Sequence, residues 1–211
     1  MTRMIWNFAL GTAAAIAVVG GISAWTLRRP EQLVFRVGTN PGGVRQRDGL
    51  ASFKPAAGDS MVAFSAGCFW GAEQAFRKQP GVVATAVGYS GGNSIFPSYE
   101  VAHKTGHLET VLVEFDPKKT SMDQLLKVFW TLPRSKNPKT STSPKSSYLA
   151  TIWTYSLSEL NLAEQSRAAM EKVLHYKLAV KVLPACPFYL AEEYHQQYDE
   201  KSGKELCPAI P

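Results

Sequence analysis

The chain has 211 residues and a formal net charge of +6, and 45% of its residues are hydrophobic. This length suits one domain with an appendage, and the composition is typical of a globular protein rather than a disordered one. Residues 1–60 hold seven Lys or Arg against three Asp or Glu, so most of the positive excess precedes the predicted domain. Basic and aromatic residues are not interleaved in a way that would bind nucleic acid, and that class of function is excluded.

The N-terminal segment is predicted to be an apolar helix. Residues 4–27 carry no charge, and a helix of about 20 apolar residues spans a membrane. We expect residues 1–29 to be an uncleaved anchor, although a signal segment cleaved near Gly21 stays open. Arg28 and Arg29 favour a cytoplasmic domain, whereas the short basic start favours export, so the side is open and the periplasm is slightly preferred. Residues 30–60, rich in Pro and Gly, are predicted to be a flexible linker before the folded domain, residues 61–211.

A strand–turn–helix unit carries the first candidate functional residue, Cys68. Residues 61–64 predict a strand and residues 72–78 a helix, with Cys68 in the turn between them. A cysteine at the start of a helix meets unpaired N–H groups and the positive end of the helix dipole, which favour the thiolate. A buried, inert cysteine is the alternative, and both interpretations stay open. Trp70, which lies off the apolar stripe of the helix, either lines a site or packs under a loop.

The next strands carry a tyrosine and an acid. Residues 82–87 predict a strand that leads into a flexible turn at residues 88–93, where Tyr89 lies. Residues 107–115 predict another strand, in which alternation places Glu109 on the apolar face. Burial there would raise the pKa of Glu109 and keep a proton on its carboxyl group, as a general acid requires. A frayed strand end that exposes Glu109 to water is the alternative.

The remaining pattern predicts an α+β fold. A helix follows residue 121, a strand covers residues 148–155, a long helix runs to residue 177, and a short strand covers residues 180–184. This order favours a two-layer domain, a mixed β-sheet packed by helices with a ferredoxin-like core. We interpret His107 and His195 as hydrogen-bonding scaffold rather than metal ligands, and Glu192 as solvated or structural.

Several motifs occur here in the order in which one enzyme family carries them. They are Gly67-Cys68-Phe69-Trp70-Gly71, Gly88-Tyr89-Ser90-Gly91-Gly92, Thr105-Gly106-His107-Leu108-Glu109 and Glu193-Tyr194-His195-Gln196-Gln197-Tyr198. Over roughly residues 61–207 the sequence resembles peptide methionine sulfoxide reductase of type A. The resemblance implies a peptide-methionine (S)-S-oxide reductase, which repairs oxidised methionine in proteins or free, in the response to oxidative stress.

The resemblance implies a role for each matching residue. Cys68 would attack the sulfoxide sulfur and become a sulfenic acid, while Glu109 gives a proton to the oxygen. Cys207 would then form a disulfide with Cys68, which a thioredoxin-type reductant opens. The substrate-binding residues implied by the family are Phe69 and Trp70 around the methyl group, with Tyr89 and Tyr148 at the oxygen. The family uses no metal, flavin or haem, and we expect a monomer.

The sequence departs from the family pattern in a few places. Ser143 stands where the family carries Asp, and Leu149 stands where it carries Arg. Cys186 replaces a glycine and is either a relay thiol or a bystander. These changes leave an alternative from another class of function: a degenerate member that binds oxidised segments, or senses oxidant through Cys68, with little turnover.

Overall fold

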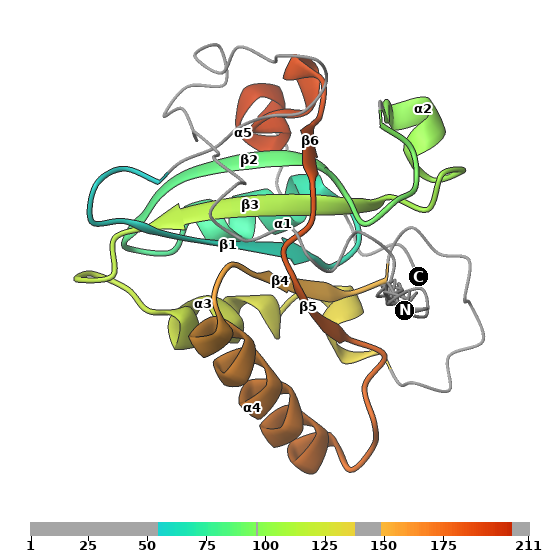
Figure 1. Ribbon diagram of the computed structural model, residues 1–211. Helices are drawn as coiled ribbons and strands as arrows, with labels where there is room; N and C mark the ends of the chain where they lie inside the picture. The colour runs from blue at the N-terminus through green and yellow to red at the C-terminus, as the bar shows by residue number, and fades with distance from the viewer. Residues whose placement is uncertain (1–54, 96, 138–148, 204–211) are drawn as a thin grey trace, which may run out of the picture.

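Six strands form one mixed sheet. The structure is a computed structural model that describes residues 55–95, 97–137 and 149–203. The strands are β1 Ser60–Ser65, β2 Val82–Ser90, β3 Leu108–Phe115, β4 Thr151–Thr154, β5 Lys181–Pro184 and β6 Phe188–Leu190. Their order is β5-β4-β1-β3-β2-β6, and every neighbouring pair is antiparallel except β4 and β5. The predicted α+β class with a mixed sheet is confirmed (Figure 1).

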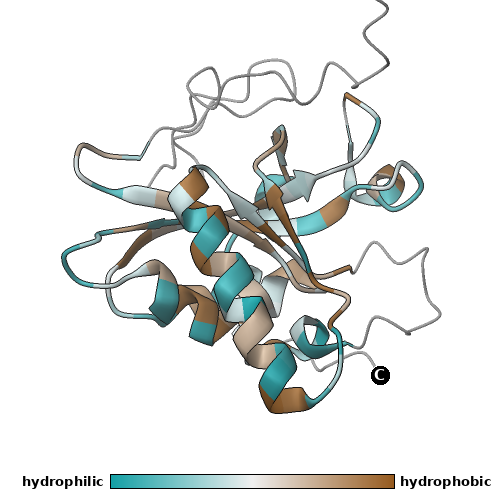
Figure 2. Cartoon of the chain, turned by 60° about the horizontal axis from the view of Figure 1, so that its bottom comes forward, coloured by the Kyte–Doolittle hydropathy of each residue, from teal (hydrophilic) through white to brown (hydrophobic). Residues whose placement is uncertain are grey.

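Helices make the long connections between the strands. The helices are α1 Phe69–Arg77, α2 Tyr99–Ala102, α3 Met122–Phe129, α4 Leu157–Leu174 and α5 Tyr198–Ser202, with short 3-10 turns at Pro133–Lys136 and Glu193–His195. Helix α1 joins β1 to β2, and α3 joins β3 to β4. The four strands β4-β1-β3-β2 therefore have the split β-α-β connections that the predicted ferredoxin-like core requires. Figure 2 shows polar and apolar residues interleaved along α4.

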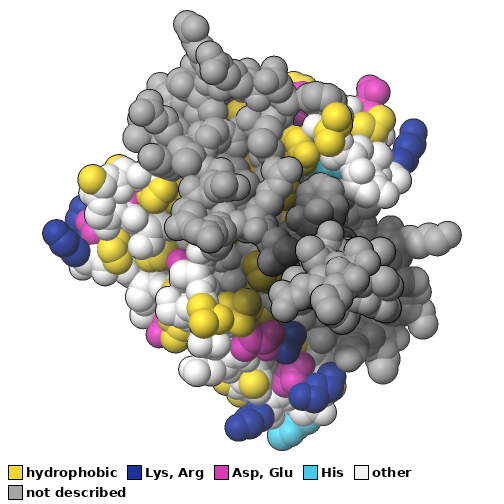
Figure 3. Space-filling model, viewed as in Figure 1, with side chains coloured by type: hydrophobic (Ala, Val, Ile, Leu, Met, Phe, Trp, Pro, Cys, Tyr) yellow, Lys and Arg dark blue, Asp and Glu magenta, His cyan; other side chains and the backbone are white. Residues whose placement is uncertain are grey.

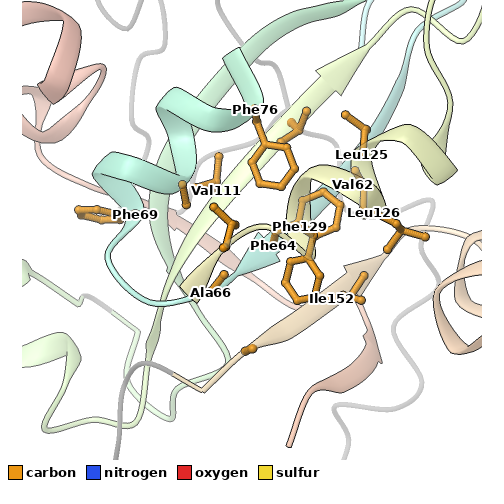
Figure 4. Packing of buried hydrophobic residues seen from close by; sticks show 14 of the residues in the cluster. Val62, Phe64, Ala66, Phe69, Phe76, Val111, Leu125, Leu126, Phe129 and Ile152 are labelled. Carbon is orange, nitrogen blue, oxygen red and sulfur yellow. The ribbon is translucent and has the colours of Figure 1, made fainter. Parts of the chain in front are cut away.

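The larger part of the core lies between the sheet and the helices. Phe64 of β1 stacks on Phe76 of α1 with ring centroids 4.6 Å apart, and on Phe129 of α3 at 5.5 Å. Alternation along β3 sends Val111 to this side and Leu112 to the smaller apolar group on the opposite face. Figure 4 shows Phe69 at the start of α1, apart from the Phe64, Phe76 and Phe129 rings. Phe69 belongs to the same core group, at the Cys68 end of α1.

Two predicted boundaries are wrong, and both concern the site. The turn predicted at residues 88–93 begins too early, because β2 continues to Ser90 and pairs there with Phe188 of β6. Gly88 is needed for a close approach rather than for a turn, since a Cβ there would lie 2.2 Å from the Tyr189 carbonyl oxygen. Helix α1 begins at Phe69, three residues before the predicted start. As a result, Tyr89 lies in a strand and Phe69 and Trp70 lie in a helix, rather than in turns.

The outer edge of β2 is completed by a side chain. Beyond the last β6 pair, the Gln196 Oε1 accepts a hydrogen bond of 2.8 Å from Val87 N. The same amide donates through Nε2 to the carbonyl oxygens of Val87 and Ala191, each at 2.9 Å. Gln196 is 1% exposed, so its amide takes the place of a further strand residue.

Several expectations fall on residues that the structure does not describe. The predicted anchor and most of the linker precede residue 55, while Tyr148 and Cys207 lie outside the described ranges. Within those ranges, no helix is both long and apolar enough to cross a membrane. On the face in Figure 3, the coloured basic and acidic side chains are interspersed.

Candidate active site

Cys68 occupies the N-cap position of α1. The chain leaves β1 through Gly67, whose φ of +99° favours glycine, and a Cβ there would lie 2.9 Å from the Arg134 Cγ. Cys68 has φ −56° and ψ 122°, and its side chain is half-buried. The N–H groups of the first helical turn have no acceptor within the helix, and the helix dipole favours negative charge at this end. The backbone therefore supports a thiolate at Cys68.

Glu109 lies beside this turn. Its Oε2 accepts a hydrogen bond of 2.9 Å from the backbone N of Phe69, the residue that follows Cys68. Glu109 is 3% exposed, on the helix-covered face of β3, as the alternation predicted. Burial raises the pKa of Glu109 to about 7, although the Phe69 hydrogen bond lowers it. Of the two alternatives for Glu109, the structure shows the buried acid, and a pKa raised to about 7 leaves its carboxyl group partly protonated at neutral pH.

The hydrogen bonds indicate which oxygen carries that proton. Because Oε2 accepts from Phe69 N, the acidic proton is expected on the other oxygen, Oε1. The Nε2 of His103, just after α2, lies 3.6 Å from this Oε1. Burial lowers the pKa of His103, so the neutral imidazole is favoured there. A neutral ring places no positive charge beside Glu109 that would favour the carboxylate over the protonated acid. Glu109 can therefore donate from Oε1.

Aromatic rings surround the first turn of α1. The ring of Phe69 lies 6.0 Å from that of Tyr89, which stands directly opposite Glu109 in the β2–β3 register. Trp70 stacks on Tyr198 at 3.9 Å and also packs against the main core. Tyr89 is fully buried, and Phe69 is 1% exposed. Phe69 and Trp70, which directly follow Cys68 in the chain, and Tyr89, which stands opposite Glu109, thus form one aromatic group beside the acid.

A second layer of polar residues holds these aromatic groups. The Tyr89 hydroxyl donates a hydrogen bond of 2.9 Å to Glu192 Oε2, and Tyr99 N donates one of 3.0 Å to Glu192 Oε1. Burial opposes the charge on Glu192, but the hydrogen bonds from Tyr99 N, from the N–H of Glu192 itself and from Tyr89, together with the nearby His195, hold the pKa of its carboxyl group below the usual range. The Trp70 Nε1 donates to His195 Nδ1 at 3.1 Å, as expected of a scaffold histidine.

The second described cysteine is in a different environment. Cys186 packs against the smaller apolar group on the opposite face of the sheet. Burial raises the pKa of its thiol to about 11, despite hydrogen bonds from Gly91 and Ser90. In the part of the chain that the structure describes, no group of three or more His, Cys, Asp or Glu is arranged to hold a metal ion.

Five of the seven predicted site residues can be placed. The structure brings together Cys68, Phe69, Trp70, Tyr89 and Glu109, while Tyr148 and Cys207 lie outside the described residues. Glu192 was interpreted as solvated or structural, and the structural alternative holds, because it accepts a hydrogen bond from Tyr89, 103 residues away. No local pattern reveals that partner, and sequence reasoning missed His103 as a neighbour of Glu109. His103 had no signal beyond its place in a short segment between the site strands.

The fold and this site define a class: an α+β enzyme that places a cysteine at a helix N-terminus beside a buried carboxylic acid. The sequence profile of the family Peptide methionine sulfoxide reductase matches residues 60–210, and the chain belongs to that family. A peptide methionine sulfoxide reductase MsrA of Methanosarcina acetivorans is 44% identical over 155 residues, which cover 71% of this chain and 82% of that protein. The type A resemblance is therefore confirmed.

Other relatives agree in sequence and in structure. A peptide methionine sulfoxide reductase of Brassica napus is 41% identical over 158 residues, but the match spans only 60% of its length and 71% of this chain. Methionine sulfoxide reductase A of Corynebacterium diphtheriae superimposes with a TM-score of 0.64 at 25% identity, covering 85% of this chain and 92% of that one. Reduced Mxr1 of Saccharomyces cerevisiae gives 0.63 at 28% identity, with 74% and 93% covered.

Proposed function

We propose that this protein reduces methionine-S-sulfoxide, in proteins or free, to methionine by thiol chemistry. The observation that carries the proposal is the hydrogen bond of 2.9 Å between Phe69 N and the Glu109 carboxyl group. It fixes a proton-bearing acid one peptide unit from a cysteine at a helix N-terminus. A sulfoxide needs both at once, a nucleophile at sulfur and a proton at oxygen.

In the first step, the bond between oxygen and the substrate sulfur breaks, and a bond between oxygen and the Cys68 sulfur forms. The Cys68 thiolate attacks the sulfoxide sulfur while Glu109 Oε1 gives its proton to the oxygen. The oxygen becomes bonded to the Cys68 sulfur as a sulfenic acid, and the substrate leaves as methionine, reduced by two electrons. Glu109 is left as a carboxylate and regains a proton from solvent before the next turnover. The cysteine sulfur is oxidised by as much as the substrate is reduced.

The second step returns Cys68 to the thiol. The Cys207 thiol attacks the sulfenic sulfur, water leaves, and a Cys68–Cys207 disulfide forms. A thioredoxin-type dithiol protein then reduces the disulfide and becomes oxidised itself. The support for Cys207 and for this reductant is the family resemblance. The chemistry needs no prosthetic group, because thiols supply both electrons.

Aromatic side chains account for the choice of substrate. Phe69 and Trp70 offer an apolar wall to the methyl group, and Tyr89, with Tyr148 by resemblance, offers hydroxyl groups to the oxygen. Held in this way, only one epimer directs its sulfur at Cys68 and its oxygen at Glu109. The S epimer is proposed because the family resemblance implies it.

The place of action is a separate proposal. Residues 1–29 would anchor the domain to a membrane, with residues 30–60 as tether and the domain on the periplasmic side. Its support is the uncharged run of residues 4–27. Proteolysis of intact cells and of cells with a permeabilised outer membrane tests this proposal. A periplasmic domain is cleaved once the outer membrane is permeabilised, whereas a cytoplasmic domain stays protected.

A single-turnover assay tests the proposed activity. The reduced protein is mixed with separated S and R epimers of a methionine sulfoxide peptide, without reductant, and methionine is counted. We expect one methionine per protein from the S epimer, none from Cys68→Ser, and a Cys68–Cys207 bridge in the peptide map. Binding of the peptide without any methionine would instead support the degenerate binder, and a bridge to Cys186 alone would contradict the Cys207 assignment.

A further inference from the structure

Glu109 must be protonated again after each turnover, although it is almost completely buried. Under the proposed function, the first step leaves its carboxyl group as a carboxylate, and the next substrate needs the proton back on Oε1. Only 3% of Glu109 is exposed, and its other oxygen accepts a hydrogen bond of 2.9 Å from Phe69 N. The acid therefore has little contact with the water that must supply the proton.

The imidazole of His103 lies between this acid and solvent. Its Nε2 is 3.6 Å from Glu109 Oε1, while 34% of its side chain is exposed. His103 is the C-cap of the short helix α2, and its ring lies edge-on to that of Tyr99, with centroids 6.0 Å apart. Tyr99 N in turn donates a hydrogen bond of 3.0 Å to Glu192, so the His103 ring packs against a residue that is itself held in place. His103 thus contacts the acid through Nε2 and also reaches water.

The other ionisable groups around this pair are poor proton donors for Glu109. Tyr89 stands opposite Glu109 in the β2–β3 register, but its hydroxyl proton is donated to Glu192. Although burial opposes its charge, Glu192 has a pKa below the usual range because of its hydrogen bonds and the nearby His195, so it has no proton to give near neutral pH. An imidazole, by contrast, ordinarily gains and loses a proton close to neutral pH.

The charges of the two groups give the transfer its direction. Burial lowers the pKa of His103 below its ordinary 6.5, and burial raises the pKa of Glu109 to about 7, so the proton is favoured on Glu109. When Glu109 is ionised, its negative charge 3.6 Å away favours a proton on His103. The imidazole therefore takes up a proton from water when the acid has lost its own. Once the proton is on Glu109, that charge is gone and the neutral ring is favoured again.

We propose that His103 is a proton relay from solvent to Oε1 of Glu109. After the sulfoxide oxygen has taken the Glu109 proton, His103 Nε2 binds a proton from water, moves by less than about 1 Å and donates it to Oε1. One proton enters in each turnover, and no electron passes through the ring. This proton balances the one that Cys68 releases when its reduced thiol becomes a thiolate again. His103 acts on the reaction through Glu109, and the scheme rests on the proposed function.

A pH jump isolates the reprotonation step. The reduced protein is held at about pH 9, where Glu109 is a carboxylate, and is then mixed with a methionine-S-sulfoxide peptide in buffer at about pH 6. The rate of the first turnover is compared with that of the same protein held at pH 6 throughout. We expect equal rates in the wild type. In His103→Ala, the protein from pH 9 should be slower by at least about tenfold, because its acid waits for a proton. A change that only distorts the site would lower both rates alike.

Further variants separate a relay from a structural contact. His103→Gln keeps a polar side chain of similar size but cannot carry a proton near neutral pH, so the delay should remain. Free imidazole should remove the delay in His103→Ala, where the missing ring leaves space, but not in His103→Gln. The matched control is the exposed His175, which ends α4 with a φ of +60°. His175→Asn suits that backbone and should show no delay.

Three results would overturn the relay: equal behaviour of wild type and His103→Ala in the pH jump, a delay that His103→Gln abolishes, or a delay in His103→Ala that imidazole does not shorten. If the wild-type protein forms no methionine after either treatment, the proposed function itself fails. An active protein in which His103→Ala shows no delay removes only the relay.

Discussion

The turn at Cys68 and the β5–β6 connection at Cys186 place the same side chain in opposite situations. Cys68 is half-buried at the N-terminus of α1, with the Glu109 acid bound to the next peptide N–H. Cys186 lies on the opposite face of the sheet among apolar side chains, where burial raises the pKa of its thiol to about 11. The two cysteines therefore differ in their backbone position and in the acid beside them, and under the proposed function these differences, rather than the presence of a cysteine alone, determine thiol reactivity.

The largest expected effect comes from removing the acid at the Cys68 end. Glu109→Gln keeps the shape and the acceptor for Phe69 N but cannot donate an acidic proton, so we expect single-turnover methionine formation to slow by at least about 10²-fold. In the wild-type protein, the rate should also fall as pH rises through about 7, because Glu109 then loses its proton. A stopped-flow pH profile measures both, and an alkaline fall that persists in Glu109→Gln would assign that ionisation to another group.

Alkylation compares the two thiols directly. At pH 7, a thiol with a pKa of about 11 is thiolate in only about one part in 10⁴, and the thiolate is the reacting form. We expect iodoacetamide to modify Cys68 at least about 100-fold faster than Cys186, as measured by peptide mapping after timed quenching. Comparable rates would mean that Cys186 is reachable and ionised, and the contrast between the two regions would be lost.

The site also has a cost in stability. Burial raises the pKa of Glu109 from 4.5 to about 7, so the folded protein binds this proton more tightly than the unfolded chain does. The contribution of the group to stability is present below about pH 4.5 and is lost as pH rises through about 7, up to about 3 kcal/mol in free energy of unfolding. Urea unfolding of wild type and Glu109→Gln at pH 5 and pH 8 isolates this contribution, because the other acids are common to both proteins. A difference that does not change with pH would show that Glu109 is hydrated when charged.

The smallest effect is expected at the other thiol. Cys186→Ala should change the single-turnover rate by less than about twofold and leave the yield of methionine and disulfide unaltered, since a buried thiol of raised pKa neither attacks nor leaves readily. A lower disulfide yield in this variant would make Cys186 a relay thiol.

The sequence predicted those parts of the site that depend on residues close together in the chain. Alternation in β3 predicted the face of Glu109 but left its burial open against a frayed strand end, and the strand–turn–helix pattern predicted the place of Cys68. The continuation of β2 through Tyr89 could not be predicted locally, because Gly88 looks like a turn residue until β6 is known to lie against it. The contact between Tyr89 and Glu192 depends on two distant segments meeting at the end of the sheet. Patterns of period two or 3.6 carry no information about such meetings.

The Gln196 amide on β2 has a consequence beyond the site. An exposed strand edge offers unpaired N–H and C=O groups to other chains, and such edges nucleate aggregation. β6 covers this edge for only three residues. Next to it, the Val87 carbonyl accepts from Ala191 N and from the Gln196 amide, which in turn accepts from Val87 N. Under the proposed function, this protein would meet oxidised chains, and the unfolded ones among them offer strand edges of their own. By pairing with the backbone groups of Val87, the Gln196 amide would prevent a strand of another chain from pairing with β2 there.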